Sequence, residues 1–201
     1  GFHFNISARE RIQLLADDGT FKELNRSLIS LNPLSFSGGV SYKKKLFEAQ
    51  RMTGLTEAAV TGLCEIKGCP TVIVALDFGF LGGSMGCVVG EKVALALEHA
   101  SKRKSPAVAV VTSGGARIQE GAGSLAAYGD IFLRNTLFSG VVPQISVIVG
   151  PAAGGAVYSP AITDFVFMVN GTGQMYITGP DVIKAVTGET VTHEELGGAP
   201  S

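Results

Sequence analysis

Residues 107–117 read Ala-Val-Ala-Val-Val-Thr-Ser-Gly-Gly-Ala-Arg, a short apolar run followed by paired glycines. A run of this length without polar alternation is typical of a strand that is covered on both faces. Glycines directly after a strand let the backbone reverse, or approach a ligand, without a Cβ in the way. The stretch therefore predicts a buried strand and a tight turn, and the residues after it predict a helix over 119–138.

The same order of strand, glycine turn and helix recurs on both sides of this stretch. Apolar strands begin at residues 71 and 144, and each is followed by a glycine turn. These turns read Gly82-Gly-Ser-Met-Gly86 and Gly150-Pro-Ala-Ala-Gly-Gly-Ala156, and helices are expected after them over 84–102 and 153–161. Parallel strands joined by right-handed crossover helices explain this repeat most economically, so the predicted fold class is α/β.

Further elements are expected outside the repeats. Ser7 with Glu10 three positions later matches a capping box, which predicts a helix over 7–16. A second helix should begin at Ser41 after a loop, and apolar segments at 58–66 and 71–76 predict a hairpin. Near the end of the sequence, we expect strands over 166–169 and 174–177, and a helix that starts at Pro180.

The composition is that of one globular domain, which we expect to cover residues 1–201. Hydrophobic residues make up 46% of the chain and charged residues 16%, which is too apolar for a disordered chain. The formal net charge of -1 gives no reason to expect nucleic acid or a membrane surface as a partner. Cys64, Cys69 and Cys87 lack the spacing of zinc knuckles, so no metal site is expected. No apolar run reaches the roughly 18 residues that span a bilayer, and we expect a soluble, cytoplasmic protein.

The three glycine turns form the candidate functional site. They follow the carboxyl ends of predicted parallel strands, where ligands bind in open α/β sheets. The helix N-termini there present unpaired N–H groups and the positive end of the helix dipole. Three such turns in register, all with paired glycines, favour a site that stabilises an anion. No phosphate-binding loop or dinucleotide fingerprint occurs in the sequence.

One turn also matches a catalytic motif of another class. Gly82-Gly-Ser-Met-Gly86 has the form G-x-S-x-G between a strand and a helix, which would make Ser84 a nucleophile. Its partners would be His193 and either Asp164 or Asp181, which follow in the chain order of an α/β-hydrolase. A serine hydrolase is therefore the alternative hypothesis.

Several longer strings together resemble one family, the carboxyltransferase beta subunits of biotin-dependent acyl-CoA carboxylases. The most recognisable is Thr112-Ser-Gly-Gly-Ala-Arg-Ile-Gln-Glu-Gly121. Asp77-Phe-Gly-Phe-Leu-Gly-Gly-Ser-Met-Gly86 is similar to the acetyl-CoA carboxylase member, whereas the strings beginning at Gly150 and Glu194 are more similar to propionyl-CoA carboxylase beta. The resemblance covers nearly the whole chain.

The resemblance implies a crotonase fold, a spiral of repeated ββα units, and an enzyme whose substrates are carboxybiotin and an acyl-CoA. In that chemistry the biotin anion left by loss of CO2 removes the α-proton of the thioester, and the enolate then attacks CO2. The acceptor would be acetyl-CoA, giving malonyl-CoA for fatty acid biosynthesis, or propionyl-CoA. The same chemistry in a decarboxylase remains open, as does a non-catalytic scaffold. The family segment that contains Ser84 has no serine nucleophile.

The resemblance also assigns roles to individual residues. Backbone N–H groups at Gly114, Gly115, Ala153 and Gly154 would form the oxyanion hole for the thioester. The residues expected to bind the substrate's CoA or line its site are Gly82, Gly83, Ala116, Arg9 and Arg11, the two arginines as possible phosphate contacts. Arg117 is expected to brace its turn through Glu120 or a carbonyl rather than to touch substrate.

Partners follow from the same resemblance. They are a partner carboxyltransferase subunit or domain, a biotin carboxyl carrier protein and biotin carboxylase, within an oligomer. The family domain continues past Gly198, so the chain is expected to be truncated at its C-terminal end, with any zinc ribbon lying before Gly1. The chain alone is therefore expected to be inactive.

Overall fold

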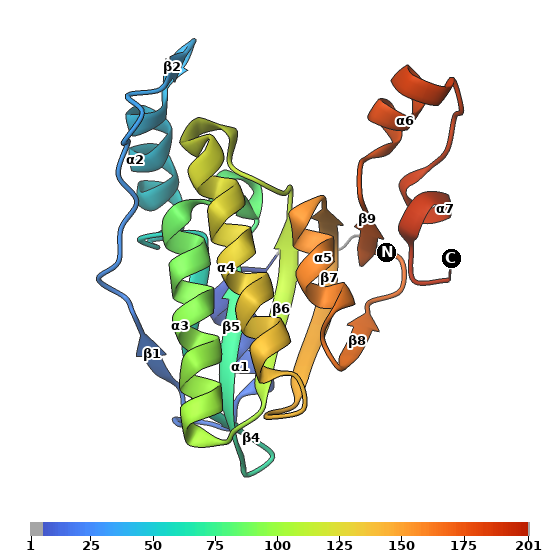
Figure 1. Cartoon of the computed structure of the whole chain (residues 1–201). Coiled ribbons are helices and arrows are strands. Elements are labelled where there is room, and N and C mark those ends of the chain that lie inside the picture. Colours follow the sequence, from blue (N-terminus) through green and yellow to red (C-terminus); the bar gives the residue numbers. More distant parts are fainter. Residues whose placement is uncertain (1–5, 201) are drawn as a thin grey trace.

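A mixed sheet organises the fold, and the computed structural model describes residues 6–200 of the chain. In these residues seven strands form one sheet in the order β1-β4-β5-β6-β7-β8, and β9 pairs with the end of β7 (Figure 1). The strands of this sheet are β1 (Lys22–Leu24), β4 (Ala59–Ile66), β5 (Cys69–Leu76), β6 (Ala107–Ser113), β7 (Gln144–Ala153), β8 (Phe165–Met168) and β9 (Gln174–Tyr176). A separate small hairpin joins β2 (Ser37–Gly38) to β3 (Val40–Ser41).

Four neighbouring strands are parallel, as the sequence predicts. β5, β6, β7 and β8 run in one direction, while β4 pairs antiparallel with β5 through the turn at Lys67 and Gly68. Both turn residues have positive φ, 51° and 74°, the combination that a two-residue hairpin with right-handed strand twist requires. The α/β class and the predicted hairpin are confirmed.

Helices cover the two faces of the sheet unequally. The helices α3 (Cys87–Arg103), α4 (Ala122–Phe138) and α5 (Gly155–Ala161) lie on one face, and α1 (Ala8–Leu15) lies on the other (Figure 1). Residues of β7 alternate between buried and partly exposed along the whole strand, because alternate side chains point toward the helical layer. The buried core therefore lies mainly between the sheet and α3, α4 and α5.

The expected helix starts are confirmed at the first two helices. Ser7 and Glu10 form a complete capping box before α1, in which each side chain accepts from the other residue's backbone N–H. Ser41 accepts a hydrogen bond from Lys44 N–H and so caps α2 (Tyr42–Thr53). Gly54, in a left-handed conformation with φ 68°, ends α2.

The helices α3 and α4 begin a few residues later than predicted. A short 3₁₀ turn, η1 (Leu81–Gly83), precedes the expected start of α3, and a second, η2 (Ile118–Glu120), occupies part of the expected first turn of α4. The strand β7 continues four residues past its predicted end, because its last residues pair with β9, for example Ala153 with Tyr176. The connections before α3 and α4 are therefore longer than the sequence predicts, whereas only Gly154 separates β7 from α5.

The last part of the described chain forms two further helices, α6 (Pro180–Thr187) and α7 (His193–Gly197). Pro180 occupies the start of α6, as predicted. A bridge between Gln174 and Gly198 returns the chain to β9, so that α7 lies beside this strand (Figure 1). Across residues 6–200, no helix combines the length and apolar character that crossing a membrane requires.

Candidate oxyanion site

The three glycine turns meet at the carboxyl ends of β5, β6 and β7. The N–H of Gly114 donates to the carbonyl of Gly82 at 2.9 Å, which joins the first turn to the second. A Cβ on Gly115 would lie 3.1 Å from the carbonyl oxygen of Ala153, which places the third turn against the second. At Gly83 a Cβ would lie 2.4 Å from a β6 carbonyl oxygen, so only glycine allows this approach.

Most of the backbone amides expected to form the oxyanion hole donate hydrogen bonds within the fold. Besides Gly114, the N–H of Gly115 donates to Ser113 Oγ at 3.2 Å, and that of Gly154 donates to Tyr176 O at 3.2 Å. Ala153 is the last residue of β7 and lies in its pairing with β9. These bonds stabilise the turns, and an oxyanion could use the same three N–H groups only by displacing them. The structure therefore favours neighbouring amides as donors.

Two neighbouring amides have no such bond. Met85 N–H donates to Gly115 O at 2.9 Å and Arg117 N–H donates to Met85 O at 2.8 Å, so the extended backbone directs the intervening Ala116 N–H to the opposite side. Gly155 is the first residue of α5, where a helix has no acceptor for its N–H. Within residues 6–200 neither amide donates a hydrogen bond.

Gly155 lies at the candidate site, and the sequence analysis did not single it out. A Cβ at this position would lie 2.7 Å from the ring of Tyr128, a residue of α4 that is buried. The ring therefore packs directly on the backbone at the start of α5. The pair Gly154-Gly155 was the sequence signal for this position. The contact of Gly155 with Tyr128 of α4 becomes visible only in the folded chain.

The Arg117 side chain braces the turn, as predicted, and contacts more residues than Glu120. Its guanidinium donates to both carboxylate oxygens of Glu57 at 2.7 and 2.8 Å, to Glu120 Oε1 at 3.2 Å and to Tyr42 Oη at 3.1 Å. It also donates to the hydroxyl and the carbonyl oxygen of Ser84 at 3.1 and 2.8 Å. Glu57 and Tyr42 lie far away in sequence, and no local pattern identifies them.

The hydroxyl of Ser84 has no hydrolase partners. It accepts from Arg117, whereas His193 Nδ1 lies 3.0 Å from Tyr176 Oη and Asp164 accepts from Gln144 N–H. In the described part of the chain, no histidine or carboxylate forms a hydrogen bond with the Ser84 side chain. These bonds give the serine hydrolase hypothesis no support, because the fold directs His193 and Asp164 to other partners.

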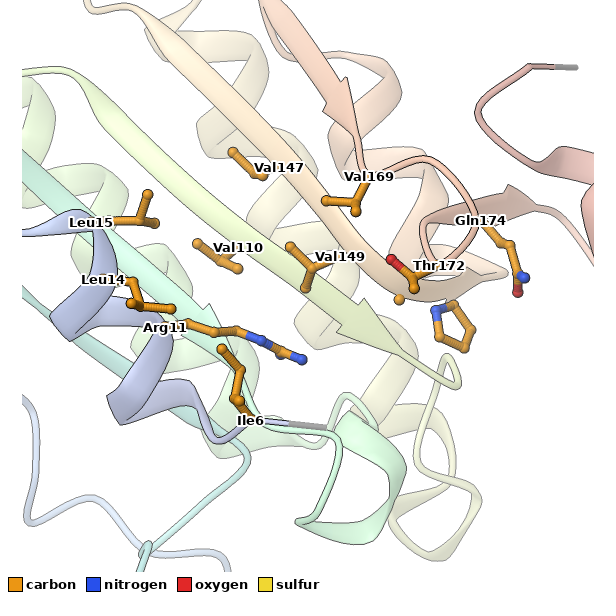
Figure 2. Close-up of a pocket in the computed structure, with 12 residues that line it drawn as sticks. Ile6, Arg11, Leu14, Leu15, Val110, Val147, Val149, Val169, Thr172 and Gln174 are labelled. Carbon is orange, nitrogen blue, oxygen red and sulfur yellow. The ribbon is translucent and has the colours of Figure 1, made fainter. Parts of the chain in front are cut away.

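The two arginines proposed for CoA phosphates lie on the other face of the sheet. Arg9 forms an ion pair with Glu23 at 2.8 Å. Arg11 extends from α1 into a pocket of about 570 Å³, alongside Val110 and Val149 (Figure 2), and its Nη1 donates to Leu76 O at 3.4 Å. Burial lowers the pKa of Arg11, and the charge of Asp77 opposes that shift. A phosphate contact of either arginine stays a prediction.

The lining of this pocket is mainly apolar. It is formed by Ile6, Leu14, Leu15, Val110, Val147, Val149, Gly150, Pro151 and Val169 together with Arg11, Thr172 and Gln174 (Figure 2). Groups of His, Cys, Asp or Glu able to hold a metal ion are not found among residues 6–200.

Known proteins identify the family to which this arrangement belongs. The model of the carboxyl transferase domain matches residues 5–201. The propionyl-CoA carboxylase carboxyltransferase subunit of Haloferax mediterranei is 48% identical over 96% of this chain and 35% of its own length. The alpha subunit of methylmalonyl-CoA decarboxylase from Propionigenium modestum is 47% identical over the same shares of the two chains.

A solved structure agrees with the sequence comparison. Transcarboxylase 12S, with hydrolysed methylmalonyl-coenzyme A bound, superposes with a TM-score of 0.83 at 43% identity, over 96% of this chain and 35% of that one. The chain thus spans about a third of the length of these relatives. The crotonase-like α/β fold that the resemblance implied is confirmed by this match. The chain belongs to the carboxyl transferase domain family.

Proposed function

We propose that this chain forms the acyl-CoA-binding part of a biotin-dependent carboxyltransferase that acts on propionyl-CoA. The observation that supports it most is the juxtaposition of two glycine turns that each carry an amide without an acceptor, Ala116 and Gly155. Fixed N–H donors of this kind stabilise the negative charge that develops on a carbonyl oxygen during reaction. A thioester enolate needs this stabilisation.

The two amides would hold the thioester oxygen while the α-carbon reacts. Carboxybiotin, on a carrier protein, supplies the CO2 and, after its loss, the base that removes the α-proton. The chain therefore needs no side-chain base, which agrees with the engagement of His193 and Asp164 elsewhere in the fold. Gly155 begins a helix, whose positive dipole end adds to the stabilisation.

The acyl group is inferred from the relatives. Those described above are named for propionyl-CoA and methylmalonyl-CoA, so we propose propionyl-CoA rather than acetyl-CoA as the acceptor. Methylmalonyl-CoA decarboxylation is the same carboxyl transfer run in reverse, and the same amides would serve it. The partners proposed are a second carboxyltransferase domain, a biotin carrier and biotin carboxylase, in an oligomer.

The test uses the complete enzyme that contains this chain. With carboxylated biotin carrier and an acyl-CoA, we expect carboxyl transfer to propionyl-CoA with a higher kcat/KM than transfer to acetyl-CoA. Equal or better transfer to acetyl-CoA would contradict the proposed substrate. Failure to transfer to either acceptor, and failure to decarboxylate methylmalonyl-CoA in the reverse assay, would contradict the proposed function.

A further inference from the structure

The buried network around Arg117 has no donor left for a substrate. A guanidinium has five N–H donors, and each of its three nitrogens faces acceptors on Glu57, Glu120, Tyr42 or Ser84. Arg117 is 1% exposed and Glu57 is not exposed at all. Any effect of this network on the reaction must therefore pass through the backbone that it holds.

That backbone is the turn which carries the Ala116 amide. Arg117 is the next residue, and its N–H donates to Met85 O while its carbonyl accepts from Ser124 Oγ at 2.5 Å. The side chain and both backbone groups of Arg117 are thus fixed by separate partners. The peptide between residues 115 and 116 is held through its carbonyl, because Met85 N–H donates to Gly115 O at 2.9 Å, so a rotation of this peptide would break that bond beside the fixed Arg117.

Glu120 extends the same network to the beginning of α3. Its Oε2 accepts from the N–H of Cys87, the first residue of α3, at 2.6 Å, and its Oε1 accepts from Tyr42 Oη. Tyr42 is itself the first residue of α2 and is fully buried. The network therefore joins the turn after β6 to the N-termini of two helices.

A buried network of this kind contributes geometry more than net stability. Removing two charges from water costs about as much as their mutual attraction returns, so such pairs are weak evidence for stability. Burial lowers the pKa of Arg117, but the hydrogen bonds and charge of Glu57 outweigh burial and raise it, so the guanidinium stays charged. The carboxylate of Glu57 also accepts from Ala58 N–H and from Ser30 Oγ, which fixes it at the start of β4.

We propose that Glu57 and Tyr42 are positioning residues, which act through Arg117 to orient the Ala116 amide toward the thioester oxygen. The inference rests on the proposed function, because it assigns that amide its role. Neither side chain would touch substrate, and their effect would appear in the transition state, where misplacement of a donor by about 1 Å can cost 10²-fold in rate.

The first experiment compares Glu57→Gln with wild type in the complete enzyme. We expect kcat for carboxyl transfer to fall about 10- to 100-fold while KM for acyl-CoA stays within about twofold, because the amide matters most when the oxygen becomes negative. Glu98→Gln is the matched control, since Glu98 pairs with Arg134 between α3 and α4, away from the turns, at 3.1 Å. Unchanged kcat in Glu57→Gln would overturn the proposal.

Tyr42→Phe keeps the proposal testable if Glu57→Gln does not fold. This change removes only a hydroxyl, and with it the bonds to Glu120 and Arg117. We expect a smaller loss of kcat, about 3- to 10-fold, again with little change in KM. A rise in KM with unchanged kcat would instead point to a substrate-binding role and would contradict positioning.

Amide hydrogen exchange separates this inference from the proposed function, because it needs no reaction. The Arg117 N–H is bonded to Met85 O, and loosening the network should speed exchange in the peptide covering residues 114–118 at least tenfold. The Glu98→Gln control should leave that peptide unchanged. Exchange that is unaltered in both Glu57→Gln and Tyr42→Phe would overturn the positioning role even if the enzyme proves to act on another substrate.

Discussion

At the scale of single residues, the proposed chemistry depends on the N–H of Ala116. The carbonyl of Gly115 and the N–H of Arg117 are both bonded to Met85. The N–H of Ala116 between them has no acceptor in the described part of the chain. Proline has no N–H, so a change to proline removes the donor while adding little volume.

Ala116→Pro should lower kcat of the complete enzyme about 10²- to 10³-fold, the loss typical of one oxyanion donor. Ala122→Pro is the control, because Ala122 is the first residue of α4 and also follows a glycine with positive φ. Proline is tolerated at the first helical position. Steady-state kinetics and thermal melts of both variants check the prediction, and similar activity in the two would contradict it.

Thiol reactivity also belongs to this scale. Cys69 and Cys87 are both exposed, but burial of the sulfur and the nearby Glu120 raise the pKa of Cys87 to about 11. At pH 8 about one in a thousand of such thiols is ionised, and only the thiolate reacts. Iodoacetamide followed by mass spectrometry should therefore modify Cys69 well before Cys87. Equal rates at the two positions would show that Glu120 does not contact the thiol.

At the scale of elements, α3 and α4, the helices that follow the first two glycine turns, pack closely against each other. Gly90 of α3 faces Ala127 of α4, and a Cβ at Gly90 would lie 2.5 Å from the Cβ of Ala127 and 3.0 Å from its Cα. The helices therefore meet backbone to backbone, and even a methyl group would separate them.

Gly90→Ala should lower the free energy of unfolding by about 1–3 kcal/mol, the usual cost of overpacking. Gly129→Ala, on the exposed side of α4 with nothing within 4 Å of its Cβ, should raise it by about 0.5–1 kcal/mol. Denaturant unfolding of the two variants measures both changes. Opposite signs are expected for the same chemical substitution, and equal signs would contradict this account of the crossing.

At the scale of the whole molecule, the chain spans about a third of the length of its relatives. The resemblance to acyl-CoA carboxylases implies that a partner domain holds a second set of oxyanion donors, for the biotin. Under the proposed function, the turns described here would supply donors for the thioester alone.

We therefore expect the isolated chain to transfer no carboxyl group from carboxybiotin to propionyl-CoA, while the complete enzyme does so. The measurement is incorporation of labelled carboxyl into methylmalonyl-CoA, with the complete enzyme as positive control. Turnover by the isolated chain would show that residues 1–201 contain both sets of donors.

The sequence alone determined the main elements of the repeats and the place of the candidate turns between them. Capping residues such as Ser7 and Ser41, the apolar runs of β5, β6 and β7, and the glycines after them are local signals, because they depend on hydrogen bonds and periodicity over a few residues. From these signals follow the α/β class, the parallel strands and the candidate turns.

Only the tertiary structure decided which groups within those turns are available. The amides of Gly114 and Gly154 are bonded to Gly82 and Tyr176, residues on other segments, and the sequence does not show which segments pair. Glu57 likewise reaches Arg117 across 60 positions. An amide's availability depends on whether a distant acceptor lies within hydrogen-bond distance, and that is a property of the folded chain rather than of any local pattern.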